Sequence, residues 1–319
     1  MKKLINEQRR LIINSLKSLI TTDYALLDIP NHKNIGDNLI WAGELEFLSN
    51  YISHKCVYSA NVWNYQDYKL EGVDTILFHG GGNWGDLYRE CQEFRLNLCK
   101  KFPNKRIIVF PQTVYYLNDT LLYSDNSILN QHPDLHVCAR DQASYDILKN
   151  NGAKYDILLL PDMAFFLDFP QSNIITKKDL LLSRVDQEAI FGLTVNSNTN
   201  IDIKDWPTFT NNVLLHRIIS KFLDFTNSFS VFLQKYKLTS FLVDSEYGLN
   251  NRQNRQRYIK IGVDFLNQYD KIYTTRLHGL ILGVLLQKEI YILDNKYNKC
   301  INYYNTWLKE FNNIHLVSK

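Results

Sequence analysis

Several basic side chains and a histidine are concentrated in one stretch, residues 271–299, near the end of the chain. Arg276 and His278 come first, and Lys296 and Lys299 follow about twenty positions later. Arginine binds phosphate or carboxylate through two parallel hydrogen bonds, and lysine adds a compact positive charge. Histidine exchanges a proton near neutral pH. Together these side chains could bind a small anion and protonate it.

The pattern around these residues predicts a strand at 271–275, a buried helix at 277–286 and a second strand at 289–293. A right-handed crossover of this kind brings both strand ends to the same edge of a sheet. Arg276 and His278 would then lie where the helix begins, and free N–H groups there favour an anion. Taken singly, each has a simpler role, the arginine capping a carbonyl and the histidine filling a core. The convergence with a lysine favours the anion site.

A run of three glycines follows another predicted strand, at 74–78, in the sequence HGGGNWGD of residues 79–86. Consecutive glycines cost conformational entropy, and they are expected where the backbone must bend sharply and leave room for a bound group. The run is neither the G-x-G-x-x-G dinucleotide motif nor a P-loop, which would end in Gly-Lys-Ser/Thr. It therefore predicts a binding turn for another kind of ligand.

Strands and helices alternate through the first half of the chain, which predicts a doubly wound parallel sheet. Ligands bind such sheets outside the carboxyl ends of the strands. Those predicted ends carry Asp37, Asn83, Gln112, Arg140 and Asp162. For Arg140 two roles stay open, as a salt-bridge partner of a neighbouring aspartate or as an anion clamp.

The domain organisation expected from these patterns is two Rossmann-like domains facing a cleft, an α/β architecture of the GT-B type. The boundary falls in a predicted linker, giving domains at 1–170 and 171–319, and a last helix at 301–311 could return to the first domain. Residues 186–212 are polar and yield no assignment, whereas 213–236 has helical spacing.

Composition excludes several classes of protein. The 319 residues carry a net charge of only +3, so no nucleic-acid partner is indicated. Five scattered cysteines fit reduced thiols in the cytoplasm, and neither they nor the histidines have metal-ligand spacing. No segment is apolar enough to span a bilayer. The basic amphipathic N-terminal segment, residues 1–20, is expected to pack on its own domain, with peripheral contact to the inner face of a membrane as the alternative.

Several of these motifs resemble the polysaccharide pyruvyl transferase family, and in particular its branch in bacterial exopolysaccharide operons. The matching stretches are TTRLHGLILGVLL with DNKYNK, the glycine turn HGGGNWGDLY, the turn of Asn34, Gly36 and Asp37, and the element of Arg140, Asp141 and Ser144. The resemblance extends from Asn34 to Trp307. Two departures are Trp84, in place of a smaller aromatic residue, and Lys296, which leaves the identity of the key lysine open.

The resemblance implies transfer of a pyruvyl group from phosphoenolpyruvate to a lipid-linked or nucleotide-linked saccharide, forming a cyclic ketal. No cofactor or metal is expected. The residues expected to be catalytic are His278, Arg276 and Asp37. Those expected to bind the donor are Arg140, Lys299, Arg184 and Lys296. Those expected to face the acceptor are Asn83, Asp86, Gly81, Gly82 and Gln112.

The leading alternative is a GT-B glycosyltransferase whose basic residues hold the diphosphate of a nucleotide-sugar. A non-catalytic scaffold is a third hypothesis, and the complete set of Arg, His and Lys speaks against it.

Overall fold

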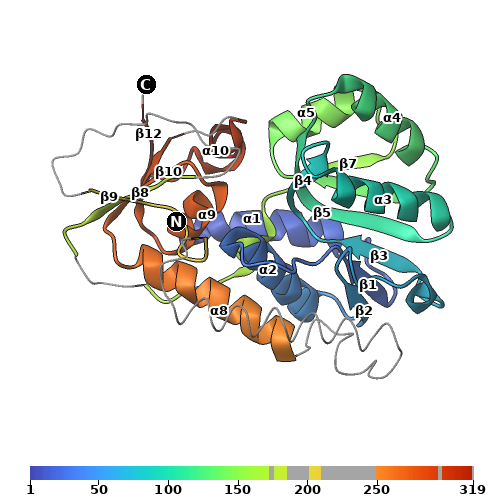
Figure 1. The fold of residues 1–319 in the computed structure, drawn as a ribbon, viewed down its shortest axis with the longest axis horizontal. Coiled ribbons are helices and arrows are strands. Elements are labelled where there is room, and N and C mark those ends of the chain that lie inside the picture. Colours follow the sequence, from blue (N-terminus) through green and yellow to red (C-terminus); the bar gives the residue numbers. More distant parts are fainter. Residues whose placement is uncertain (172–175, 185–200, 210–248, 294–296, 318–319) are drawn as a thin grey trace.

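The computed structural model describes residues 1–171, 176–184, 201–209, 249–293 and 297–317. Within these residues the chain forms two separate sheets, and every strand pair in both is parallel. Figure 1 shows the two sheets on opposite sides of the molecule, with helices between them. The α/β class with parallel sheets, predicted from the sequence, is confirmed.

The first sheet has the strand order β2-β1-β3-β5-β6-β7, and β4 pairs with β5 beyond the end of β3. Its strands are β1 (Tyr24–Leu27), β2 (Cys56–Ala60), β3 (Thr75–Phe78), β4 (Gly81–Gly85), β5 (Arg106–Tyr115), β6 (Leu135–Ala139) and β7 (Asp156–Leu159). The strand order changes direction between β1 and β3, because the chain runs outward to β2 and then returns. Such a switch point is where open α/β sheets bind their ligands.

The second sheet has the order β12-β11-β10-β8-β9. Its strands are β8 (Asp179–Leu182), β9 (Ile201–Lys204), β10 (Lys271–Thr274), β11 (Glu289–Ile292) and β12 (Ile314–Leu316). Its direction changes between β8 and β10, which gives a second switch point. Strand β10, the helix after it and strand β11 are the unit that the sequence predicts around Arg276 and His278.

The helices that cover these sheets are, in the described residues, α1 (Lys2–Leu16), α2 (Ile35–Tyr51), α3 (Arg89–Lys101), α4 (Asp119–Leu129), α5 (Gln142–Asn150), α8 (Leu249–Leu266), α9 (Leu277–Leu285) and α10 (Lys299–Tyr303). Short 3-10 turns occur at η1 (Asp67–Leu70) and η2 (Met163–Phe166), and a π-helical turn, η3 (Tyr304–Leu308), follows α10. The predicted helix at 213–236 lies outside the described residues.

The first sheet is buried on both faces, which explains its nearly continuous apolar strands. One face contributes Leu26, Leu77 and Ile108 to a core shared with α1 and α2. The opposite face contributes Leu27, Ile76 and Val109 to a core shared with α3, α4 and α5.

Helix α2 belongs to the cores of both sheets. Ile35 and Leu39, in its first turns, pack in the core of the second sheet, whereas Trp41 and Phe47 pack under the first sheet. Gly262 of α8 permits this close approach, because a Cβ there would lie 2.7 Å from Ile35 Cγ2. The helix is therefore apolar on most of its circumference, as expected for an element buried between two layers.

Helix α1 and the C-terminal segment also connect the two halves of the molecule. Ile5 packs in the core of the second sheet, and Ile12 packs under the first. The Trp307 Nε1–H donates to the carbonyl of Arg140 at 2.8 Å, and the backbone N–H of Gln142 donates to Thr306 Oγ1. The apolar stripe that made membrane contact an alternative is thus used for packing. Among the described helices, none is long and apolar enough to cross a bilayer.

Candidate active site

A cavity of about 580 Å³ lies where the switch points of the two sheets face each other. This volume is in the usual range of small-molecule sites, about 300–1,000 Å³. The first sheet contributes Asp28, after β1, and His79 and Gly80, after β3. The second contributes Arg184, after β8, and the residues that begin α9. The cavity therefore lies at the carboxyl ends of strands from both sheets.

His278 is held at the start of α9 by two glycines. Gly279 lets the helix lie against β8 and β10, since a Cβ there would come within 2.5 Å of both Leu182 Cδ2 and Thr274 Oγ1. Gly36, in the first turn of α2, leaves room for the imidazole, because its Cβ would lie 2.4 Å from His278 Nδ1. The ring thus projects from one half of the molecule onto a helix of the other.

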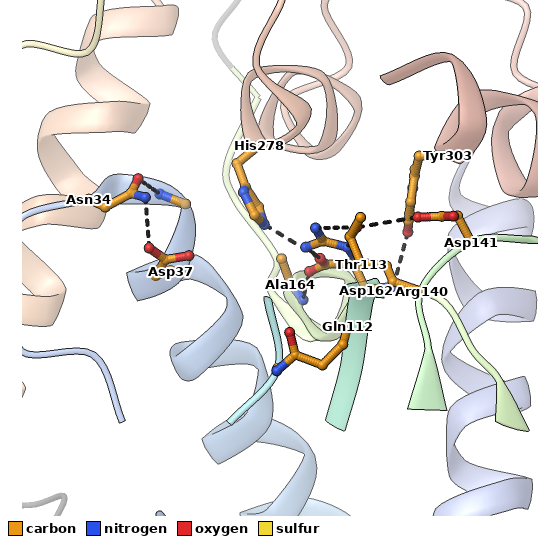
Figure 2. A network of polar contacts seen from close by, with 12 residues as sticks. Asn34, Asp37, Gln112, Thr113, Arg140, Asp141, Asp162, Ala164, His278 and Tyr303 are labelled. Carbon is orange, nitrogen blue, oxygen red and sulfur yellow. Dashed lines mark hydrogen bonds and ion pairs between the residues drawn. The ribbon is translucent and has the colours of Figure 1, made fainter. Parts of the chain in front are cut away.

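Arg140 and His278 meet at one carboxylate, that of Asp162 (Figure 2). Asp162 Oδ2 lies 2.8 Å from Arg140 Nη1 and 3.4 Å from His278 Nε2. Burial alone would raise the pKa of Asp162, but His278, Arg140 and the N–H of Ala164 hold it well below its usual value. Arg140 also donates to Thr113 Oγ1 through Nε and Nη2. The two sequence-predicted residues are therefore brought together by a third, charged residue.

Tyr303 supports this network from the C-terminal segment. Its hydroxyl accepts the backbone N–H of Asp162 at 3.0 Å. Figure 2 draws this contact as a dashed line from the Tyr303 hydroxyl. The start of α10 therefore lies beside the network, and Lys299, its first residue, is buried there.

Lys299 and Arg140 approach the glycine turn from the same side. A Cβ on Gly82 would lie 3.5 Å from both Lys299 Nζ and Arg140 Nη2. Lys299 Nζ also lies 5.6 Å from the ring of Tyr297. Two cations thus converge on the stretch where the backbone carries no side chain. Lys296, the other predicted lysine, lies outside the described residues.

Arg276 and Arg184 line the same cavity from the second sheet. The Arg276 guanidinium donates to both oxygens of Asp205 and lies 5.1 Å from the ring of Phe209. The backbone N–H of Arg184 donates to Thr275 Oγ1 at 3.3 Å. The ion pair with Asp205 neutralises part of the positive charge with which Arg276 was expected to attract an anion.

Asp37 faces the cavity from the first turn of α2. Its Oδ2 accepts Asn34 Nδ2–H at 2.7 Å and lies 3.6 Å from His32 Nε2. Burial alone would raise the pKa of Asp37, but His32, His278, His79 and Arg140 together lower it. Asp37 therefore stays ionised and is a weak base, suited to accepting hydrogen bonds.

Only some of the residues expected to face the acceptor line the cavity. Gly82 and Asn83 line the cavity. Gln112 is fully buried and donates to the carbonyl of His79 at 2.8 Å, so it fixes the glycine turn from behind. Gly81 lies over α2, where a Cβ would be 3.8 Å from Asp37 Oδ1. Asp86 is not brought to the cavity lining, because its carboxylate accepts the backbone N–H groups of residues 117 and 118.

Several residues at the site were not predicted as site residues from sequence. The charged or titratable ones are Asp28, His32, Glu44, His79, Arg95, Asp162 and Asp205. Arg95 is buried and pairs with Asp28, which has a left-handed backbone at φ 60°. A non-glycine residue in this conformation at a switch point is a known mark of a functional turn. The sequence offered signals for Asp162, at a strand end, and for His79, beside the glycines.

Comparison with protein families gives one match over most of the chain. The model of the polysaccharide pyruvyl transferase family matches residues 34–297. This range includes His79, Arg140, Arg184 and His278 of the cavity lining.

Curated relatives and a solved structure agree with this match. The proposed pyruvyl transferase EpsO of Bacillus subtilis is 29% identical over 298 residues, 91% of this chain and 87% of the relative. Pyruvyl transferase 1 of Schizosaccharomyces pombe is 27% identical over 307 residues, 89% of this chain and 69% of the relative. A functionally uncharacterised Klebsiella pneumoniae protein has a similar crystal structure, with a TM-score of 0.62, 20% identity, and coverage of 98% of this chain and 99% of that one. At this identity, the structural likeness supports the fold alone.

Proposed function

Because the chain belongs to the polysaccharide pyruvyl transferase family, we propose that it transfers a pyruvyl group from phosphoenolpyruvate to two hydroxyls of a sugar in a polysaccharide precursor. The product is a cyclic pyruvate ketal. The observation that carries this proposal is the convergence of Arg140, Lys299 and His278 at one cavity, beside the start of α9. A small trianion with a protonatable carbon needs these groups and no nucleoside pocket.

The donor would be bound by cations and by the start of α9. Arg140 and Lys299 would hold the phosphate or carboxylate, and Arg184 and Arg276 also line the cavity. Charge-assisted contacts of this kind contribute roughly 1.5–3 kcal/mol each. The N–H groups of the first turn of α9 add a favourable dipole for an anion.

His278 would act as the general acid. Attack of a sugar hydroxyl on C2 of phosphoenolpyruvate requires a proton at the C3 methylene, and an imidazolium can donate it near neutral pH. Asp162 Oδ2 lies 3.4 Å from His278 Nε2, so this carboxylate would help to orient the ring. Breaking of the C2–O bond to phosphate then lets the second hydroxyl close the ketal ring.

We further propose that residues 1–170 and 171–319 form two Rossmann-like domains in a GT-B-like arrangement. Two parallel sheets with their switch points at one cavity support this division. The acceptor, a lipid-linked or nucleotide-linked saccharide, would lie against Asp37, Gly82 and Asn83. We place the reaction in the cytoplasm, where phosphoenolpyruvate is formed, and all five cysteines are free thiols.

We propose that turnover requires no divalent cation. In the part of the chain that the structure describes, His, Cys, Asp and Glu side chains form no group of three that could hold a metal ion. The cations Arg140 and Lys299 would neutralise the donor instead. Activity that is lost in chelator and restored by magnesium or manganese would overturn this point.

The experiment that tests the proposed function follows the mass of the acceptor. The purified protein is incubated with phosphoenolpyruvate and a panel of nucleotide-linked and polyprenyl-diphosphate-linked hexoses. We expect one acceptor to gain the mass of a single pyruvylidene group, with release of inorganic phosphate. Reactions without phosphoenolpyruvate, and reactions with His278→Ala, are the controls. Transfer of a hexose between members of the panel, with no pyruvylidene product, would contradict the proposal.

A further inference from the structure

His79 lines the cavity together with His32 and His278, and the proposed donor site gives it no role. The residue is 3% exposed and follows β3 at the switch point of the first sheet. Its backbone is fixed on both sides, since its N–H donates to the carbonyl of Leu27 and its carbonyl accepts from Gln112 Nε2. Its Nε2 is buried and has no hydrogen-bond partner among the described residues. A buried polar nitrogen of this kind at a cavity points to a ligand.

The other ring nitrogen, Nδ1, is held by a buried glutamate. Glu44 Oε2 lies 2.8 Å from His79 Nδ1, and Glu44 Oε1 accepts the N–H of Gly80 at 2.8 Å. Glu44 is fully buried in α2. Gly80 is required for this approach, because a Cβ there would lie 2.8 Å from the carbonyl oxygen of Pro111 and 3.4 Å from Glu44 Oε1. The two oxygens of this carboxylate therefore hold the histidine ring and the glycine turn in place.

This geometry decides which nitrogen carries the proton. When His79 Nδ1–H donates to the Glu44 carboxylate, Nε2 carries the lone pair. A histidine oriented by a carboxylate, with a free lone pair at a cavity, is the arrangement of a general base.

We propose that His79, oriented by Glu44, is the base that takes the proton from the acceptor hydroxyl. The proposal rests on the proposed function, and it adds the proton acceptor that transfer to a sugar requires. The base lies on the first sheet, while the acid, His278, comes from the second. The acceptor would therefore enter between them, over Gly80 and Gly82.

The two histidines balance the protons of the reaction. In the first step the acceptor oxygen bonds to C2, its proton passes to His79, and the C3 methylene receives a proton from His278. In the second step the C2–O bond to phosphate breaks, and the phosphate leaves with the electron pair and the proton from His79. The second hydroxyl bonds to C2, and its proton returns to His278. The products are the ketal carboxylate and hydrogen phosphate, and both histidines regain their starting states.

Asp37 is the other candidate base, and its surroundings make it a weaker one. Its carboxylate already accepts from Asn34, and neighbouring histidines and Arg140 keep its pKa low. Burial alone would lower the pKa of His79, but Glu44, Asp37 and Asp28 together raise it. The charged groups that act on the imidazole are Glu44 and Asp37 from α2 and Asp28 after β1, which pairs with Arg95. His32, Arg140 and His278 line the same cavity.

The decisive variant is Glu44→Gln. The amide oxygen can still accept from Gly80, but the amide NH₂ must donate to His79 Nδ1, which moves the ring proton to Nε2. The fold and donor binding should be preserved, while the base is lost. We expect turnover of the acceptor that wild type converts to fall by about 10²–10⁴-fold, with little change in phosphoenolpyruvate affinity measured by calorimetry.

His79→Gln should lower turnover to the same extent. It should also remove the acidic limb of the pH profile of kcat/KM, because that limb arises from protonation of the base and glutamine does not titrate. His132→Gln is the matched control. His132 is also a buried histidine, but it contacts the carbonyl of Phe102, away from the cavity, so turnover should not change.

The outcomes separate the possible failures. Wild type that makes no ketal would contradict the proposed function itself. Wild type that makes ketal, with Glu44→Gln close to wild-type turnover, would overturn the role of His79. Loss of phosphoenolpyruvate binding in Glu44→Gln would also overturn it, since the pair would then support the donor site. If His79→Gln does not fold, Glu44→Gln and the wild-type pH profile still decide.

Discussion

Asp162 is the residue on which the two halves of the site meet. It is fully buried, and its carboxylate serves both Arg140 and His278 through the same oxygen. The sequence left Arg140 between two roles, an ion-pair partner and an anion clamp. The structure gives it the ion pair and also a place at the cavity. The clamp remains a proposal.

Replacing Asp162 by Asn should destabilise the protein, because Arg140 would be left buried without its counter-charge. Breaking a buried pair in this way typically costs about 3–5 kcal/mol. The pKa of Asp162 lies below its unfolded value, so the stabilisation is present above about pH 4 and is lost as pH falls through the folded pKa. Urea unfolding at neutral pH should therefore show a large difference between wild type and Asp162→Asn, and unfolding near pH 3 a smaller one. An equal difference at both pH values would contradict the ionic role.

Substitutions of the proton donor and of the donor-binding lysine should affect different quantities, turnover in one case and phosphoenolpyruvate affinity in the other. His278→Ala should lower turnover by about 10²–10⁴-fold while phosphoenolpyruvate affinity is largely kept. Lys299→Met should do the reverse, because it removes a charge-assisted contact worth roughly 1.5–3 kcal/mol but leaves the acid in place. Turnover and calorimetric affinity of both variants check this. Equal losses of affinity in the two variants would mean that His278 binds the donor instead of protonating it.

At the scale of elements, the crossing of α2 and α9 positions the imidazole. Gly36 lies in the first turn of α2, and a Cβ added there would lie 2.4 Å from His278 Nδ1. Gly36→Ala should therefore displace the ring without breaking the fold, since alanine is favoured over glycine in a helix by about 1 kcal/mol. We expect strongly reduced turnover with an unchanged or slightly raised melting temperature. Full activity in this variant would show that the position of His278 is not critical.

The sequence predicted the elements with strong periodicity and missed those without it. The strand-helix-strand unit at 271–293 is confirmed as β10, α9 and β11. Strand β4 was missed because its glycines indicate a turn, although they pair with β5 from Gly81 to Gly85. Strand β9 lies in a polar segment where side-chain pattern gives no strand signal, so its neighbour Asp205 could not be predicted as the partner of Arg276.

The buried pair of Glu44 and His79 shows a second limit of sequence. Glu44 lies seven positions after Asp37, which places both on the same face of α2. From sequence alone, an acidic residue at this position is expected to face solvent. The structure shows instead that the turn of residues 79–82 packs against this face of α2. Only the packing of two distant segments reveals the pair.

At the scale of the molecule, the family resemblance stated from five motifs is confirmed over residues 34–297. What sequence could not supply is how the halves join. Helices α1 and α2 and the segment of Tyr303 to Trp307 each contact both, so the cavity is formed by packing between distant parts of the chain.

The central claim is that this cavity binds phosphoenolpyruvate as its donor. Calorimetric titration of the wild-type protein with phosphoenolpyruvate, and in parallel with uridine diphosphate, tests it most directly, because no acceptor needs to be known. We predict saturable binding of phosphoenolpyruvate that is weakened strongly in Lys299→Met. Binding of uridine diphosphate together with no measurable binding of phosphoenolpyruvate would contradict the claim and favour a nucleotide-sugar donor.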